Sequence, residues 1–306
     1  MRKNNKQRSI VKSLLAWYKR HGRTFPWRGI SNPYRILVSE IMLQQTQASR
    51  VLDKYPVFLK RFPSLRSLAT ATQRDVVIAW KGMGYNNRAV RLHRLARIVL
   101  SKYGGRIPAD YDSLIALPGI GRYTANAILS SAFGQRCAIV DVNVQRVLSR
   151  MFWKLDSPRE MRAAKEIWQL AERLLPRNNV YDWNQALMDF GATVCTSRKP
   201  DCNKCPVAQA CTSKKFMSRT IVLKRKSEKK IDGIPNRLHR GNVVRHLRNL
   251  KSSRTIRADI LGKRILRNFS QRNEKRFAAL LLGLEKDGLI QLRGNGTLTS
   301  RRVSLA

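Results

Sequence analysis

The stretch LIALPGIGRYTANAILSSAFGQRCAIVDVNVQRVLSRM, residues 114–151, decides the fold of this chain. Its segment LPGIG separates a short apolar helix from a second helix predicted over residues 122–133. Because Gly119 and Gly121 flank a single apolar residue, the backbone can turn sharply there and leave several amide groups without partners. Amides at a helix start bind anions, so the turn predicts a phosphate site; the alternative is a plain helix–helix turn.

The same stretch contains an aspartate at the start of a further predicted helix. An apolar run over residues 138–140 leads into Asp141, and a helix is expected over residues 142–152. Aspartate at this point is either only a helix cap or also a carboxylate that the helix N-terminus keeps in its charged form. Other motifs of the chain favour the interpretation of Asp141 as a charged carboxylate.

The composition predicts a polyanionic partner. The 306 residues include 61 Lys and Arg against 19 Asp and Glu, a net charge of +42, and 43% of them are hydrophobic. The chain is long enough for two domains with real cores, and nucleic acid is the partner that the charge favours. No apolar run reaches membrane-spanning length and no leader-like start is found, so we expect an intracellular protein, in the cytoplasm or nucleoid if prokaryotic, with no membrane partner.

Helical periodicity predicts an all-helical core over residues 1–211, including a helix over residues 34–50 that carries SEIMLQQT. Residues 212–232 are rich in charge and poor in periodicity, and we expect a basic linker there. Three predicted helices and a terminal β-hairpin over residues 233–306 indicate a small basic winged-helix-like domain. Residues 212–306 contain 25 Lys and Arg against 6 Asp and Glu, which favours DNA contact over a merely solvated surface.

Four of the five cysteines lie close together, and they are Cys195, Cys202, Cys205 and Cys211. Four thiolates brought together by short loops bind a soft metal centre, either zinc or an iron–sulfur cluster. Structural zinc usually binds two closely spaced cysteine pairs, whereas only Cys202 and Cys205 form such a pair here. The remaining Cys137 has no partner at ligand spacing, and a reducing compartment disfavours disulfides.

Three of these features coincide: LPGIG followed by an aspartate, the SEIMLQQT segment and the four-cysteine loop. Together they resemble the helix-hairpin-helix (HhH-GPD) superfamily of DNA glycosylases, and within it the MutY-like adenine DNA glycosylases. The resemblance covers about residues 9–211. It implies an all-α, two-lobed core that binds double-stranded DNA containing a mismatch or damaged base, and a 4Fe-4S cluster on the four cysteines of the loop at residues 195–211. We expect a monomer.

The resemblance also assigns roles to residues of this chain. The family's general acid falls on Glu40 and its catalytic aspartate on Asp141. Gln45 matches the residue that wedges into the duplex, and Tyr85 an aromatic that intercalates beside the mispaired base. The DNA-binding residues that we expect are Gln44, Gln45, Tyr85, Gly119, Gly121 and Gln185. Taken singly, Tyr85 would be read as a packed aromatic and Gln185 as a capped polar group.

The chemistry follows from these residue types. Breaking an N-glycosidic bond produces an oxocarbenium-like sugar and an anionic leaving base, so one carboxyl must donate a proton and another must stabilise positive charge. Glu40 lies on a mostly apolar helix segment, where desolvation favours the protonated acid, although a solvent-facing helix glutamate is its plain alternative. The base must leave the stack to reach both carboxyls, and a polar side chain such as Gln45 fills the gap.

Tyr123 discriminates between two mechanisms. Bifunctional relatives similar to endonuclease III have a lysine at this position, two residues after the second hairpin glycine, where it attacks the sugar. Tyrosine cannot form the corresponding imine, so we expect a monofunctional glycosylase. Tyr123 is then a catalytic-site residue that orients Asp141 or the attacking group, with helix packing as the alternative.

The chain departs from the adenine branch at two points. Val142 follows the aspartate where adenine glycosylases commonly have glycine, and the tail contains no recognisable Nudix-like domain, which typically reads 8-oxoguanine. We expect removal of adenine opposite guanine or 8-oxoguanine, because Gln44, Gln45 and Gln185 look more like the adenine enzymes. A thymine or uracil mismatch glycosylase is the alternative. From other classes, a non-catalytic DNA-binding protein or an RNA-binding metalloprotein would also fit parts of the pattern.

Overall fold

The computed structural model of the protein describes residues 2–155, 162–216, 228–251, 254–297 and 300–306. The chain folds into two compact units, each assembled from separated segments of sequence. The first unit contains residues 1–37, 109–116 and 120–224, and the second contains residues 38–108, 117–119 and 225–306. The division into a core, a linker and a C-terminal domain at residues 211 and 233 stays a prediction, and residues 217–227 of that linker lie outside the described residues.

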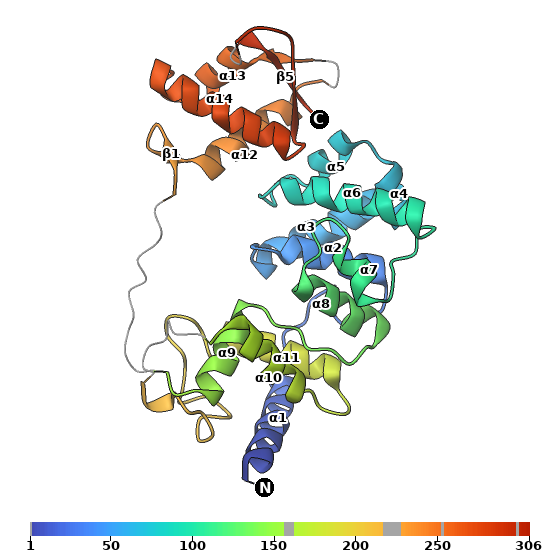
Figure 1. Ribbon diagram of the computed structural model, residues 1–306, viewed down its shortest axis with the longest axis vertical. Helices are drawn as coiled ribbons and strands as arrows, with labels where there is room; N and C mark the ends of the chain where they lie inside the picture. The colour runs from blue at the N-terminus through green and yellow to red at the C-terminus, as the bar shows by residue number, and fades with distance from the viewer. Residues whose placement is uncertain (1, 156–161, 217–227, 252–253, 298–299) are drawn as a thin grey trace. The chain divides into compact units, whose positions relative to one another are not determined.

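Helices make up the ordered elements of the chain up to residue 216, as the periodicity predicted (Figure 1). They are α1 (Arg2–His21), α2 (Pro33–Leu43), α3 (Ala48–Arg61), α4 (Leu65–Thr70), α5 (Gln73–Ala79), α6 (Asn87–Lys102), α7 (Tyr111–Ile115), α8 (Arg122–Phe133), α9 (Val142–Phe152), α10 (Ala164–Arg173), α11 (Val180–Thr193) and the 3-10 helix η1 (Lys214–Phe216). The first strand among the described residues begins only at Lys230. The expected helical fold class is therefore confirmed.

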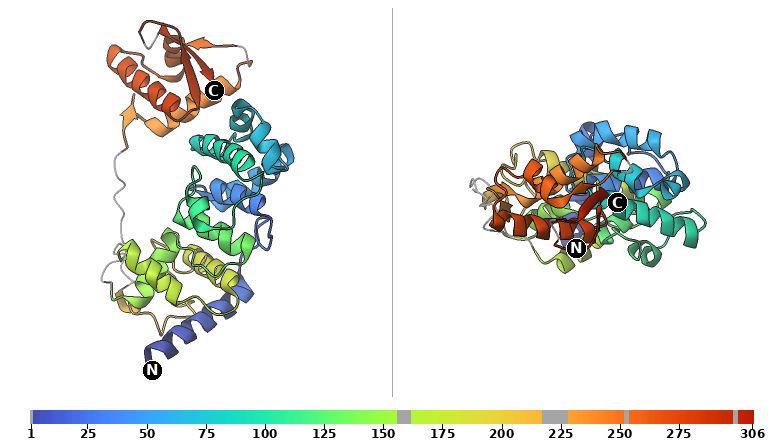
Figure 2. Two further views of the ribbon diagram at one scale, coloured as in Figure 1. Left: turned by 45° about the vertical axis from the view of Figure 1, so that its right-hand side comes forward. Right: turned by 90° about the horizontal axis from the view of Figure 1, so that it is seen from above.

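The C-terminal segment adds three helices and short strands, visible from two further directions in Figure 2. They are β1 (Lys230–Ile231), β2 (Ile234–Pro235), α12 (Asn236–Arg248), β3 (Ile256–Arg257), α13 (Ala258–Ile265), α14 (Gln271–Lys286), β4 (Ile290–Arg293) and β5 (Arg302–Leu305). The last three strands form an antiparallel sheet in the order β3-β5-β4. The three helices and the terminal β4-β5 hairpin that we expected in this segment are confirmed, whereas its assignment as a separate winged-helix-like domain stays a prediction.

The core of the first unit lies where α1, α9 and α11 pack together. Trp17 of α1 meets Phe190 of α11 edge to face, with ring centroids 5.6 Å apart. Trp183 and Val147 of α9 are both fully buried in the same cluster. Burying aromatic side chains of this size contributes a large share of the hydrophobic stabilisation, and this packing positions α9, whose N-cap is Asp141.

In the second unit, α4 and α5 pack against α6. Phe58 of α3 meets Trp80 edge to face at 5.6 Å, and both side chains are fully buried. The apolar side of α6 carries Leu92, Leu95 and Val99 at helical spacing, and all three are buried. These contacts place the turn that precedes α6.

One predicted helix is too long. Helix α2 ends at Leu43, and residues 44–47 form a turn before α3, so the predicted continuation of the helix to residue 50 is wrong. The backbone of Gln45 has a φ of +57°, in the left-handed region, and the last carbonyls of α2 are bound by a side chain from α6. A tertiary contact, which periodicity does not register, therefore ends this helix.

No helix in the described part of the chain is both long and apolar enough to cross a membrane.

Candidate active site and metal centre

The LPGIG segment forms the predicted hairpin turn between α7 and α8. Gly119 has a φ of +87°, in the left-handed region that favours glycine, whereas a Cβ there would lie at an ordinary contact distance of 3.4 Å from Cβ of Arg91. Gly121 precedes α8 with a φ of −110°, and a Cβ built on it would meet no described atom within 4 Å. The fold of the described residues therefore does not itself demand glycine at position 121.

Asp141 is the N-cap of α9, as the sequence predicted. Its Oδ1 accepts a hydrogen bond from the backbone N–H of Val144 at 2.7 Å. Its Oδ2 accepts from the side-chain amide of Asn143, also at 2.7 Å. Both carboxylate oxygens are thus engaged by donors of the first helical turn, which fixes the orientation of the side chain.

A buried arginine continues this network. Arg146, which is 6% exposed, donates from Nη2 to Oδ1 of Asn143 at 2.9 Å and to the carbonyl of Gly191 at 2.7 Å. Its Nε donates to the carbonyl of Cys195 at 3.0 Å. Burial lowers the pKa of the Arg146 guanidinium, and the nearby Cys195 and Asp141 partly oppose that shift. One chain of hydrogen bonds therefore joins Asp141 to the first cysteine of the loop.

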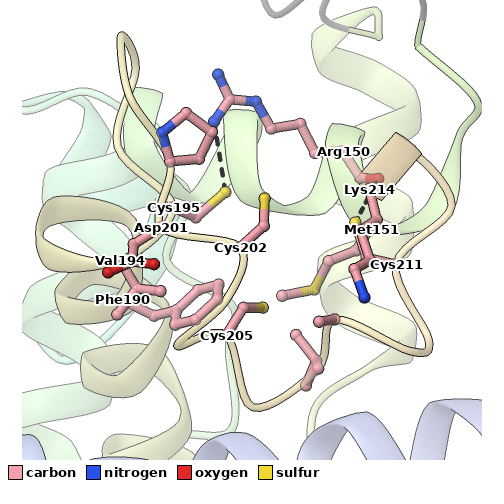
Figure 3. Close-up of a pocket in the computed structure, with 13 residues that line it drawn as sticks. Arg150, Met151, Phe190, Val194, Cys195, Asp201, Cys202, Cys205, Cys211 and Lys214 are labelled. Atoms are coloured by element: carbon pink, nitrogen blue, oxygen red, sulfur yellow. Dashed lines mark hydrogen bonds between the residues drawn. The ribbon is translucent and has the colours of Figure 1, made fainter. Parts of the chain in front are cut away.

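The four clustered cysteines line one pocket, and their side chains point toward a common space (Figure 3). No disulfide links them. The fully buried Arg150 donates from Nη1 to Sγ of Cys195 at 3.5 Å. Burial, together with the neighbouring cysteines and against an opposing backbone N–H, raises the pKa of the Cys205 thiol to about 12. Thiols gathered in this way ionise readily only beside a cation.

The donor set of the pocket limits which metal centre it suits. The pocket is lined by the side chains of four cysteines from one loop. Four thiolates suit a soft metal centre, which is either zinc or an iron–sulfur cluster.

Two further predicted residues lie in the first unit with Asp141. Tyr123 is the second residue of α8, is half-buried and donates from its hydroxyl to Sδ of Met188 at 3.7 Å. Gln185 of α11 is 8% exposed. Their roles stay predictions.

The remaining predicted residues lie in the second unit. Glu40 is a partly buried residue of α2, between two side chains that are almost fully buried. Gln44 donates from Nε2 to the carbonyl of Gly119 at 3.3 Å, which connects it with the hairpin turn. Gln45 is exposed, and Tyr85 is 50% exposed with a φ of +42°. Gln45 and Tyr85 thus combine an exposed side chain with a left-handed backbone conformation. In a non-glycine residue this conformation is strained unless neighbouring groups stabilise it.

Arg88, which sequence reasoning missed, holds both of these turns. It is 5% exposed, and burial lowers its pKa to about 10. Its guanidinium donates to the carbonyls of Ile41 (2.9 Å), Met42 (2.8 Å), Gln44 (2.5 Å), Met83 (3.1 Å) and Gly84 (3.2 Å) and to Oγ1 of Thr46 (2.9 Å). Arg88 lies one helical turn before Leu92, on the apolar side of α6. An arginine on that side needs buried hydrogen-bond partners, and this was the sequence signal that could have identified it.

Comparison with known proteins decides the family. The profile described as an HhH-GPD superfamily base excision DNA repair protein matches residues 38–173. A solved structure described as a thermostable thymine-DNA glycosylase is 35% identical, with a TM-score of 0.66, over 70% of this chain and 99% of its own. The chain belongs to the HhH-GPD superfamily of base excision DNA repair proteins.

Within the HhH-GPD superfamily, the chain is similar to adenine DNA glycosylases. It is 41% identical to the human adenine DNA glycosylase over 220 residues, which cover 69% of this chain and 40% of the relative. It is 42% identical to that of Mycobacterium tuberculosis over 197 residues, which cover 64% of each. The matches to these curated relatives thus span between about two fifths and two thirds of their length. The resemblance to the MutY-like branch is confirmed.

Proposed function

We propose that this HhH-GPD protein is a monofunctional base excision repair glycosylase that hydrolyses the N-glycosidic bond of a flipped adenine mispaired with guanine or 8-oxoguanine. One observation carries the proposal. In a chain 41% identical to an adenine DNA glycosylase, the carboxylate of Asp141 is oriented at the start of α9 by Val144 and Asn143.

Glu40 and Asp141 divide the chemistry in this proposal. Glu40 acts as the general acid that protonates the leaving base. Proton transfer of this kind increases the rate by a factor of about 10² to 10⁴. Asp141, acting as a carboxylate, stabilises the positive charge that develops on the sugar. Water then attacks the sugar, because Tyr123 has no amine with which to form an imine.

The predicted DNA-binding residues serve base flipping. Gln45 fills the space that the flipped base leaves, while Tyr85 intercalates beside the mispaired partner. Their exposure and the hold of Arg88 on both turns support these roles. The open space above Gly121 supports a close approach by a DNA phosphate to the start of α8.

Cys195, Cys202, Cys205 and Cys211 would hold the 4Fe-4S cluster. Bound there, the cluster would cross-link the loop at residues 195–211 rigidly. The network from Cys195 through Arg146 and Asn143 then keeps Asp141 in place. Double-stranded DNA with a mismatch or damaged base is the partner, and the protein works as a monomer in the compartment that holds the cell's DNA.

A thymine mismatch glycosylase is the second candidate, favoured by the 35% identity to a thymine-DNA glycosylase. Base release from labelled duplexes tests both: A·G, A·8-oxoguanine, T·G and U·G substrates are incubated with the protein and cleaved at abasic sites with hot alkali. Adenine release alone, or far faster than thymine and uracil release, supports the first candidate. Dominant thymine release supports the second, and no release from any duplex supports a non-catalytic DNA-binding protein.

A further inference from the structure

A row of three arginines crosses the C-terminal sheet. The strand register places Arg257 of β3 opposite Arg302 of β5, and Arg302 opposite Arg293 of β4. All three residues are exposed. Like charges directly opposite one another on neighbouring strands destabilise a sheet by up to about 1 kcal/mol per pair. Only Arg257 has an acidic partner among the described residues, Asp259 at 3.0 Å.

The neighbouring helix α14 has a basic exposed side. Its buried side carries Phe277, Leu281 and Leu284. The first two turns of its exposed side carry Arg272, Lys275 and Arg276, which form no ion pair with any described residue. Spacings of three and four residues put these cations on one face of the helix.

We propose that the C-terminal domain carries a second surface for duplex DNA, formed by the exposed side of α14 and by the arginine row of the β3-β5-β4 sheet. The inference rests on the proposed function only in its choice of partner. Three like charges that oppose sheet pairing, only one of them ion-paired, are explained if phosphates neutralise them in the bound state. The contacts are to phosphates and so are independent of sequence.

A duplex fits this surface better than an acidic peptide does. An exposed helix of this kind enters the major groove of B-DNA, and the flanking cations then meet the regularly spaced phosphates on either side. The helix side offers Gln271 and Leu282 in addition to its cations, and both are exposed. This surface would allow the enzyme to remain on undamaged DNA while it searches for a mismatch.

The test compares three variants of the full chain. The first neutralises α14 (Arg272→Gln, Lys275→Gln, Arg276→Gln), and the second neutralises the sheet (Arg293→Gln, Arg302→Gln). The control removes three exposed cations from α1 (Arg8→Gln, Lys12→Gln, Lys19→Gln). Affinity for an undamaged duplex is measured from low to moderate salt for each variant, together with the thermal midpoint and with base release at saturating enzyme.

The proposal predicts that the slope of log K against log salt becomes shallower by about 3 for the α14 variant and about 2 for the sheet variant, with at least tenfold weaker binding. The control keeps the slope of the unmodified chain. The thermal midpoint of the sheet variant stays or rises, because like-charge repulsion is removed. Base release at saturating enzyme is unchanged.

Unchanged slopes in the α14 and sheet variants would overturn the inference, as would an equal loss in the control. Tighter binding to single-stranded RNA than to the duplex, lost in the same variants, would also overturn it. Absence of base release by the unmodified chain would instead count against the proposed function. The comparison of duplex affinities between the variants would still test the inference.

Discussion

The guanidinium of Arg88 donates to the backbone carbonyl of Gln44 at 2.5 Å, and through the same side chain the turn after α2 is tied to the turn that carries Tyr85. Buried charge is costly unless it is fully hydrogen-bonded, so these contacts are all needed. The arginine determines the backbone course of two exposed segments that we assign to DNA distortion.

Replacing Arg88 with methionine should leave several buried carbonyls without donors. We expect a loss of about 3 kcal/mol or more in the free energy of unfolding and at least a tenfold slower base release. Single-turnover kinetics and denaturant unfolding measure the two effects. Fluorescence of a 2-aminopurine placed beside the mismatch reports base unstacking. If Arg88 had a purely structural role, the fraction of Arg88→Met that remains folded would unstack the base as the unmodified chain does.

Asp141→Asn should separate catalysis from helix capping. Asparagine caps a helix about as well as aspartate, so the unfolding free energy should change by less than about 1 kcal/mol. Base release should fall at least a hundredfold, because the charge is lost. Asp110→Asn is the matched control, since Asp110 caps α7 through the N–H of Ser113 at 2.8 Å. Equal activity of the two variants would contradict the role of Asp141.

Much of this site is readable in the sequence. The bounds of α8 and α9 agree with the predicted helices, because the glycine turn and the capping aspartate are local signals. The end of α2 was not predictable, since Arg88, which binds its last carbonyls, is 44 residues away from Gln44. Long-range polar contacts of this kind leave no periodic trace in the sequence.

Asp189 illustrates the same limit. Its carboxylate is fully buried and accepts hydrogen bonds from Arg23 (2.6 Å) and Arg28 (2.8 Å), more than 160 residues earlier in the chain. Burial alone would raise the pKa of Asp189, but the donors from both arginines outweigh it and the pKa is lowered. Neither the sequence motifs nor the family resemblance indicated this ion triad.

Asp189→Asn should destabilise the protein by about 3 to 5 kcal/mol at neutral pH, because two arginines lose their buried counter-charge. A lowered native pKa means that the stabilisation is present above the unfolded pKa of about 4 and is lost as the pH falls through the native pKa. The free energy of unfolding in urea, measured at pH 7 and in mild acid, should therefore depend less on pH for Asp189→Asn than for the unmodified chain. Asp75→Asn, in an exposed pair with Arg61, should cost less than about 1 kcal/mol.

Cys202→Ser should abolish the proposed cluster, whereas Cys137→Ser should retain it. Cys137 donates to the carbonyl of Asn126 at 3.4 Å and is not among the residues that line the cysteine pocket. Iron and sulfide content and visible absorbance of the purified protein measure the outcome, with four iron atoms per chain expected when the cluster is intact. Zinc in place of iron, in protein purified without oxygen, would contradict the assignment.

The Tyr123 assignment predicts that borohydride traps no covalent protein–DNA complex during base release, because the side chain has no amine. The product should remain an intact strand with an abasic site until hot alkali is added. Efficient trapping would show that some other amine acts as a nucleophile.

The most direct test of the account is the single-turnover rate of adenine release from an A·8-oxoguanine duplex, measured against pH for the unmodified chain and for Glu40→Gln. The account predicts a rate at least a hundredfold lower for Glu40→Gln than for the unmodified chain across the pH range, with duplex affinity unchanged, because the proton donor to the leaving base is lost. A Glu40→Gln variant that releases adenine at the unmodified rate would contradict it.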